Sequence, residues 1–417
     1  MKSINADELD LLSARDTAAR LGVKLDTLYA YVSRGLIRSV GVPGSRERGY
    51  RAADVERFRA NRGTGRGEPN QTLVPVIDSA ISLIDNGRFY YRGVDAIRLA
   101  ETATLEEVAS LLWGEFGASA PVNAPHPPTA SRRVPPSPRR RGEGWGEGQL
   151  GLIERCQIRL AMLAAENPAA LDLTRTGVGR TGSTILYELV AVIGAGAGEA
   201  VSAAAPVHRQ LAEGWRLDAS GADVVRRCLV LLADHELNAS TFVARCVAST
   251  GATPYAVVSG ALSALSGRRH GGAAARAEAL FREIGRESDP PGRDPMAVMA
   301  ARLARDEGLP GLGQPLYPDG DPRALAIVEA VAKALPEAGT RIAAAGVAAF
   351  QLTGQYPNVD FALGAAVTAL GLPPGAALSL FVVGRTVGWI AHAIEQYDTR
   401  VLIRPRARYT GRRPGVR

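Results

Sequence analysis

The strongest constraint in this 417-residue sequence is a helical pattern that runs almost unbroken from about residue 150 to residue 400. Ala- and Leu-rich amphipathic windows alternate there with Gly and Pro breaks, as in LVAVIGAGAGEA, VVRRCLVLLADHELN and PYAVVSGALSALSG. Strand signals are sparse, and the chain is long enough to bury a large core. The pattern predicts an all-α fold with a large helical domain and a smaller helical one.

A separate small module is predicted over residues 1–60. Ser13 can cap a first helix that Gly22 ends, and a second helix is predicted over Leu25–Ser33. The basic segment VGVPGSRERGY predicts a hairpin or wing, and a short helix is predicted over Ala53–Ala60. The segments SARDTAARLGVKLDTLYAYVSRGLI and RGYRAADVERF resemble the winged helix-turn-helix of the MerR and excisionase families. The alternative is a small helical interaction module of the same shape.

Three further segments complete the predicted organisation. Residues 61–71 are Gly-rich and polar and predict a linker. Apolar runs on either side of Asp85-Asn86-Gly87 predict a hairpin, and TLEEVASLLWGEF (104–116) predicts a helix. Residues 119–149 are rich in Pro, Arg and Gly without periodicity, which predicts a low-complexity insertion in which His126 has no role.

The net charge of +7 is unevenly distributed. Residues 1–66 carry 13 Lys and Arg against 8 Asp and Glu, and the segments 120–150 and 401–417 are also basic, so the rest of the chain is acidic. A basic N-terminal module is compatible with DNA as a partner. The cysteines Cys156, Cys228 and Cys246 lie far apart, which predicts neither a disulfide framework nor a thiolate metal site. The acidic N-terminus MKSINADELD and the lack of 18 consecutive apolar residues predict a cytoplasmic protein without a membrane span.

Polar residues cluster in three segments where a helical core does not require them. LADHELNAST (232–241) contains His235, ALSGRRHGGA (264–273) contains His270, and QYPNVDFALG (355–364) contains Asp360. Taken singly, a histidine at a helix end is usually a packing residue and a lone Asp is usually an N-cap.

Together these segments resemble the citrate synthases. The resemblance covers most of 72–412 outside the insertion and includes IDNGRFYYRG, ASTGATPYAVVSGAL, YPDGDPRAL, FVVGRTVGWIAHAIEQ and IRPRARYTG. It implies a homodimer that condenses acetyl-CoA with oxaloacetate and then hydrolyses the thioester to citrate and CoA. It implies no metal and no cofactor, since the coenzyme A thioester is a substrate.

The resemblance also assigns roles to individual residues. Asp360 would be the base that removes the acetyl methyl proton, and His270 would be the neutral donor that stabilises the enol. Gln314 stands in GLGQPLYPDGDPR, where the family has a third catalytic histidine. A glutamine can donate a hydrogen bond to the oxaloacetate carbonyl but cannot transfer a proton. The sequence therefore predicts an enzyme whose activity is reduced at this step.

The remaining roles implied by the resemblance concern substrate binding. His235 would bind oxaloacetate, and Arg323 and Arg385 would clamp its carboxylates, because a guanidinium matches a carboxylate in geometry. Phe381 would pack near the reacting centre. Arg404 would reach across a dimer interface into the neighbouring site.

Around His270 the sequence departs from the family pattern. Arg268 and Arg269 precede it and Ala274 follows, in place of small apolar residues and an Asn, and this affects the expected CoA contacts.

Three functions remain open at this point. The first is a citrate synthase-type acyltransferase, with a 2-methylcitrate synthase-type activity as a variant. The second is a metabolite-sensing regulator in which the enzyme fold binds oxaloacetate or CoA and residues 1–60 bind DNA. The third is a non-catalytic interaction protein.

Overall fold

The chain divides into two compact units, Met1–Ile77 and Asp78–Arg417. The computed structural model describes residues 11–23, 25–33, 37, 39–41, 48–52, 55, 77–114, 150–194, 205–285, 293–407 and 409–411. The predicted linker 61–71, the insertion 119–149 with His126 and most of the helix predicted at Ala53–Ala60 lie outside these residues.

In the residues that the structure describes, the N-terminal unit has the helices α1 and α2 beside a three-stranded antiparallel sheet. Its elements are β1 (Leu11–Leu12), α1 (Ala14–Leu21), α2 (Leu25–Ser33), β2 (Ser39–Gly41) and β3 (Arg48–Arg51), with strand order β1-β3-β2. Ser13 caps α1 by accepting the Asp16 N–H, and Gly22 ends the helix with φ +66°. Both features were predicted from the sequence, because capping depends only on nearby residues.

The larger unit begins with a second antiparallel sheet. Its strands β4 (Ser82–Asp85) and β5 (Arg88–Tyr91) pair around Asn86 and Gly87, both at positive φ, which confirms the predicted hairpin. A short β6 (Val94–Asp95) completes the sheet. These strands and those of the N-terminal unit correct the all-α prediction: the fold is mostly helical but not purely so.

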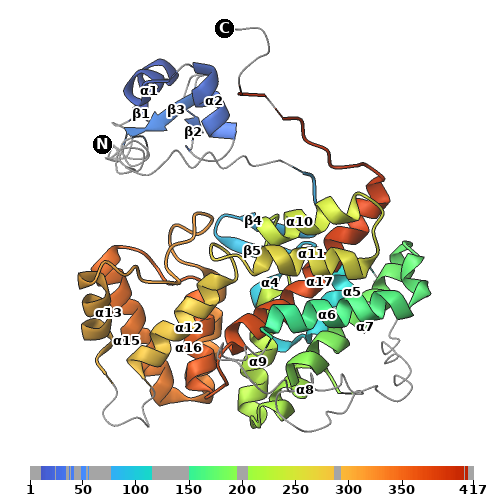
Figure 1. Ribbon diagram of the computed structural model, residues 1–417. Coiled ribbons are helices and arrows are strands. Elements are labelled where there is room, and N and C mark those ends of the chain that lie inside the picture. The colour runs from blue at the N-terminus through green and yellow to red at the C-terminus, as the bar shows by residue number, and fades with distance from the viewer. Residues whose placement is uncertain are drawn as a thin grey trace. The chain divides into compact units, whose positions relative to one another are not determined.

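Helices build the rest of the larger unit (Figure 1). A capping box on Thr104 starts α5, inside the helix predicted over 104–116. The helices are α4 (Ala96–Thr102), α5 (Leu105–Trp113), α6 (Leu152–Glu166), α7 (Arg175–Gly194), α8 (Val207–Gly214), α9 (Ala219–Leu232), α10 (Ala239–Ala248), α11 (Pro254–Leu265), α12 (Gly272–Ile284), α13 (Pro295–Ala304), α14 (Pro322–Ala334), α15 (Pro336–Thr353), α16 (Val359–Ala369) and α17 (Ala376–Thr399), with a 3-10 turn at Pro168–Leu171.

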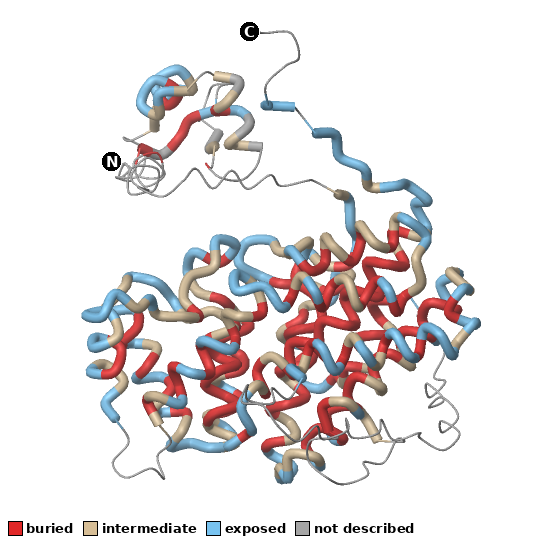
Figure 2. Tube along the Cα trace, in the orientation of Figure 1, coloured by how far each residue is buried: buried red, intermediate tan, exposed pale blue. Residues whose placement is uncertain are grey.

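The long helix α17 is the centre of the larger unit. It packs against α5, α7, α9, α10 and α11, and most of its residues are buried (Figure 2). It is long and apolar enough to cross a membrane, but 94% of its most apolar window is buried inside the unit, as in the core helix of a globular protein. Helices α12, α13, α15 and α16 lie together on one side of this group in Figure 1.

Two glycines let α17 approach the end of α9 closely. A Cβ at Gly384 would lie 2.8 Å from the Leu232 Cβ, and one at Gly388 would overlap the Ala233 carbonyl oxygen and lie 2.6 Å from Asp234 Oδ1. Both distances are too short for a real Cβ, so only glycine permits this approach. The contact sets where the residues after α9 lie.

Gly388→Ala should therefore destabilise the larger unit. The added methyl group has no space against Ala233, and overpacking of this kind costs about 1–3 kcal/mol. Denaturant unfolding measures the change. The matched control is Gly346→Ala in α15, where the added Cβ would meet only Pro357 at an ordinary 3.5 Å and should be neutral or stabilising. Equal stability of the two variants would contradict the packing described.

Candidate active site

His235 lies in the connection between α9 and α10, and only 7% of it is exposed. Its Nε2 is 3.0 Å from the Tyr317 hydroxyl oxygen, and its ring meets Phe89 edge-on. Burial lowers the pKa of His235 well below its ordinary value, and the nearby cations Arg323 and Arg385 lower it further. His235 is therefore a neutral imidazole at pH 7, able to form hydrogen bonds without carrying charge.

The preceding residue, Asp234, anchors the connection between α9 and α10. The Ser82 hydroxyl donates to Asp234 Oδ2 at 2.6 Å, and His392 Nε2 lies 3.3 Å from Oδ1. Burial raises the pKa of Asp234, but His392 and Arg385 outweigh it and the net shift is downward. The carboxylate thus stays ionised inside the protein and ties the His235 segment to β4 and α17.

The hydrogen bonds and ion pairs around Asp234 continue along α17 toward the C-terminal segment. Arg245 of α10 contacts His392 Nδ1 at 3.2 Å, pairs with Glu395 at 2.9 Å and donates from Nε to Gln396. Gln396 in turn donates to the carbonyl oxygen of Val401 at 2.8 Å. This buried chain of polar groups connects the His235 segment to the start of the segment that carries Arg404.

His270 lies in the turn between α11 and α12. Its Nε2 is 2.8 Å from the Ser240 hydroxyl oxygen, which also accepts the Trp389 indole N–H at 3.2 Å. The ring packs edge-on against Phe381, with 5.7 Å between centroids. Burial, with a further contribution from Arg385, lowers the pKa of His270 to about 4. This histidine is also neutral at pH 7, and its Nδ1 remains for a ligand.

Arg323 follows the N-cap residue of α14 and is held by that residue. Its Nε and one terminal nitrogen donate to the two carboxylate oxygens of Asp321 at 3.0 and 2.8 Å, a two-point ion pair. Asp321 also accepts the Val359 N–H at 3.0 Å, which joins the starts of α14 and α16. The guanidinium lies over the rings of Phe89 and Tyr317.

Arg385 is the most buried cation of the group and is incompletely paired. It is 1% exposed, its Nε donates to the Leu232 carbonyl oxygen at 2.8 Å, and its guanidinium lies 4.8 Å from the Phe381 centroid. One terminal nitrogen, Nη1, is buried without a hydrogen-bond partner in the part of the chain that the structure describes. Burial lowers the pKa of Arg385 to about 10, so the side chain is still a cation at pH 7. An anionic ligand would satisfy it.

Asp360 stands in the first turn of α16, after the N-cap Asn358, whose Oδ1 accepts the Asp360 N–H at 3.0 Å. Burial raises the pKa of Asp360 to about 6, since the opposing attraction of Arg323 and Arg385 only partly compensates. A carboxylate with a pKa near 6 is ionised at pH 7 and is a stronger base than an exposed aspartate.

Gln314 lies on a loop that is fastened to the segment before Asp360. Gly311 accepts the Asn358 N–H and Gly313 donates to the Tyr356 carbonyl oxygen, both at 2.8 Å. Gly311 and Gly313 have positive φ. The Gln314 side chain accepts the Leu316 N–H at 3.4 Å and is otherwise available.

The structure thus brings most of the predicted residues into one region. The Arg385 guanidinium lies over the Phe381 ring, which packs against His270, and its charge contributes to the pKa shifts of His235, His270 and Asp360. Arg404 is the exception. It is exposed in the non-helical segment after α17, where the described residues offer it no hydrogen bond or ion pair.

Sequence reasoning missed three partners of these residues: Tyr317, Ser240 and Asp321. All three lie inside segments already singled out by sequence. Their only local signal was a hydroxyl or carboxyl group close to a chosen residue, and for Asp321 a position immediately before a proline that can start a helix.

Residues 71–406 match the family model described as citrate synthase, C-terminal domain. The chain belongs to the citrate synthase family. The matched region contains every residue placed in the site above. It begins at residue 71 and leaves out residues 1–60, so the helix-turn-helix resemblance of those residues stays a prediction.

Two relatives show how this citrate synthase family member compares with named proteins. It is 30% identical to the 2-methylcitrate synthase of Shewanella oneidensis over 85% of this chain and 97% of that one. It is 39% identical to the citrate synthase of Haloferax volcanii, but over 46% of this chain and about half (50%) of that one.

Solved structures support the same fold. The citrate synthase of Thermotoga maritima matches with a TM-score of 0.63 at 25% identity, over 81% of this chain and 94% of that one. The citrate synthase of Thermoplasma acidophilum, solved with carboxymethyl coenzyme A and oxaloacetate, matches with a TM-score of 0.61 at 24% identity, over 82% of this chain and 95% of that one.

Proposed function

We propose that this citrate synthase family member condenses acetyl-CoA with oxaloacetate to give citrate and CoA. The observation that carries the proposal is the group around Arg385: a basic carboxylate, Asp360, and a neutral histidine, His270, beside a buried cation with an unsatisfied N–H donor. The condensation needs a base to deprotonate the carbon acid, a hydrogen-bond donor to stabilise its enol and a cation to bind the dicarboxylate.

Asp360 would remove a proton from the acetyl methyl group while His270 donates a hydrogen bond to the thioester oxygen. The electron pair of the C–H bond becomes the enol double bond, whose carbon then attacks the ketone carbon of oxaloacetate. As the new C–C bond forms, the ketone π electrons move to the oxygen, and this alkoxide takes a proton from water or from another residue because the Gln314 amide cannot supply one. Water then cleaves the thioester and releases CoA.

The proposed role of His270 requires the tautomer with its proton on Nδ1. The Ser240 hydroxyl lies 2.9 Å from Asn238 Oδ1 and 2.8 Å from His270 Nε2, and it has one proton to donate. When that proton goes to Nε2 instead of Asn238, the ring proton of His270 is on Nδ1. Nδ1–H would then face the thioester oxygen. Ser240 is accordingly a positioning residue for His270.

Oxaloacetate would bind between His235, Arg323 and Arg385. Arg385 keeps an unpaired nitrogen for one carboxylate. Arg323 is already held by Asp321, so it would offer the substrate its remaining N–H donors in a fixed orientation.

A homodimer would complete the site through Arg404 of the neighbouring chain. The exposed apolar residues Val401 and Leu402 lie three and two residues before it, and Ile158 and Met162 leave an apolar surface on α6. Residues of this kind favour burial in an interface.

The identity of the acyl-CoA substrate is a separate question. The relatives carry the names citrate synthase and 2-methylcitrate synthase, so propionyl-CoA, which leads to 2-methylcitrate, is the second candidate substrate. Comparing kcat/KM for the two thioesters decides between them.

DNA binding by residues 1–60 stays a separate prediction of the sequence. It is supported by the basic excess of that segment and by the order α1, Gly22, α2 and the β2–β3 pair. The catalytic proposal does not depend on it.

Asp360→Asn should abolish thiol release from acetyl-CoA in the presence of oxaloacetate. An amide cannot accept the methyl proton, and loss of a general base costs about 10²–10⁴ in rate. A thiol-reactive dye measures the free CoA. Asp85→Asn, at an exposed hairpin turn, is the matched control and should retain full activity. No release by the wild-type protein with either thioester would overturn the enzyme proposal.

The rate should fall in acid because Asp360 must be ionised to act. Its pKa of about 6 lies above the value of about 4 for His270, so protonation of the base comes first. We expect kcat/KM to be level above pH 7 and to fall about tenfold per pH unit below 6. Initial rates from pH 5 to 8, with the folded state monitored by circular dichroism, test this. A profile that is level down to pH 5 would contradict the assignment.

Gln314→His should increase turnover. An imidazole can both polarise the oxaloacetate carbonyl and deliver a proton to the oxygen, whereas the amide does only the first. One such donor is worth about 10²–10³ in kcat. Gln351→His, exposed on α15, is the control and should leave kcat unchanged. If Gln314→His leaves the rate unchanged or lowers it, proton delivery does not limit this enzyme.

A further inference from the structure

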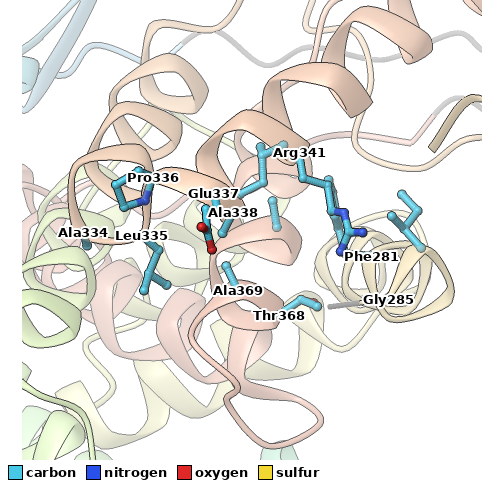
Figure 3. Close-up of a pocket in the computed structure, with 13 residues that line it drawn as sticks. Phe281, Gly285, Ala334, Leu335, Pro336, Glu337, Ala338, Arg341, Thr368 and Ala369 are labelled. Carbon is cyan, nitrogen blue, oxygen red and sulfur yellow. The ribbon is translucent and has the colours of Figure 1, made fainter. Parts of the chain in front are cut away.

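A cavity of about 480 Å³ lies among the ends of helices α12, α14 and α16 and the start of α15 (Figure 3). Its size is within the range of small-molecule sites. Phe281, Ile284, Leu335 and Ile342 supply apolar walls, and Glu337 and Arg341 are its charged residues. None of the residues placed in the candidate active site lines it.

The geometry of three helices separates this cavity from the active site. His270 lies two residues before α12, Arg323 is in the first turn of α14 and Asp360 is in the first turn of α16, whereas the opposite ends of all three helices line the cavity. These helices have 11 to 13 residues. At a rise of 1.5 Å per residue, the two places are about 15–20 Å apart.

Arg341 brings an unpaired cation to the cavity. Its Nη1 is buried without a hydrogen-bond partner among the described residues. Glu337 is one helical turn away on α15, yet the structure contains no ion pair between them in its described part. In Figure 3 the Arg341 side chain extends away from Glu337, toward Phe281 and Gly285. A buried guanidinium nitrogen without an acceptor is unfavourable, and an anion would remove the penalty.

The start of α15 adds backbone donors to the cavity. The first turn of the 18-residue helix α15 lines it through Pro336, Glu337 and Ala338. Proline has no N–H, so the donors are the N–H groups of Glu337 and Ala338, which have no partners within the helix. The other helix ends at the cavity are the C-terminal ends of α12, α14 and α16, whose dipoles oppose an anion, but some of their carbonyl groups have hydrogen-bond partners. The Phe281 carbonyl accepts the Gly285 N–H, and the Thr368 carbonyl accepts the Gly371 N–H.

We propose that this cavity binds a small carboxylic acid with an apolar chain. The carboxylate would pair with Arg341 near the start of α15, and the chain would lie against Phe281, Ile284 and Ile342. Neither the condensation activity nor its substrates are needed for this binding.

Isothermal titration calorimetry with hexanoate tests the site. The full chain is first saturated with oxaloacetate, so that carboxylate positions in the active site are filled. Wild-type protein should bind one hexanoate per chain. Arg341→Met should weaken binding at least tenfold, Arg341→Lys should retain most of it, and Glu337→Gln should leave it unchanged or strengthen it. Hexylamine, equal in chain length and opposite in charge, should not bind.

Thermal unfolding of each variant confirms that it is folded before titration. Unaltered hexanoate binding by Arg341→Met would overturn the proposal. So would hexylamine binding as tightly as hexanoate, or a hexanoate signal that disappears when oxaloacetate is present, because the acid would then lie in the active site.

Discussion

The close contact between α17 and the end of α9 is the constraint on which the site depends. Gly384 and Gly388 remove the side chains that would separate the two helices, and Arg385 lies between them in sequence. Its Nε reaches the Leu232 carbonyl oxygen, one of the carbonyls left without a partner at a helix C-terminus. A cation is thereby fixed in the core, and the connection that carries Asp234 and His235 is held against α17.

Burying that cation has electrostatic consequences for its neighbours. Because Arg385 and Arg323 lie in a poorly solvated region, a positive charge on either site histidine would be costly, and both imidazoles stay neutral. Asp321 neutralises Arg323 with a two-point pair, whereas Arg385 has no such partner. The carboxylates Asp234 and Asp360 act on Arg385 through their charge, but neither forms a hydrogen bond with it among the described residues, so its Nη1 keeps an N–H donor for a substrate carboxylate. The first turns of α14 and α16 also favour a bound carboxylate, since helix N-termini attract anions.

What the sequence predicts well is local, and what it misses is brought together by folding. Ser13, Gly22 and the Asn86–Gly87 turn act on residues a few positions away, so their effects were visible in the sequence. The roles of Asp360 and His270 came from a family resemblance and not from spacing. The partners Ser240, Tyr317 and His392 approach from distant segments, 30 residues or more along the chain. Arg404 is exposed and forms no hydrogen bond or ion pair with the described residues of its own chain, so its predicted role depends on a second copy of the chain.

Gln314 shows how backbone and side chain contribute separately to such a site. Hydrogen bonds from Asn358 to Gly311 and from Gly313 to Tyr356, with a third from the Asn358 amide to the Gly313 carbonyl, fix this loop to the segment that leads into Asp360. None of these bonds involves the side chain of residue 314. The glutamine therefore occupies a position whose geometry is set independently of its identity, and its difference from histidine is chemical. It can polarise a carbonyl, but the proton that the new alkoxide needs must come from water or from another residue.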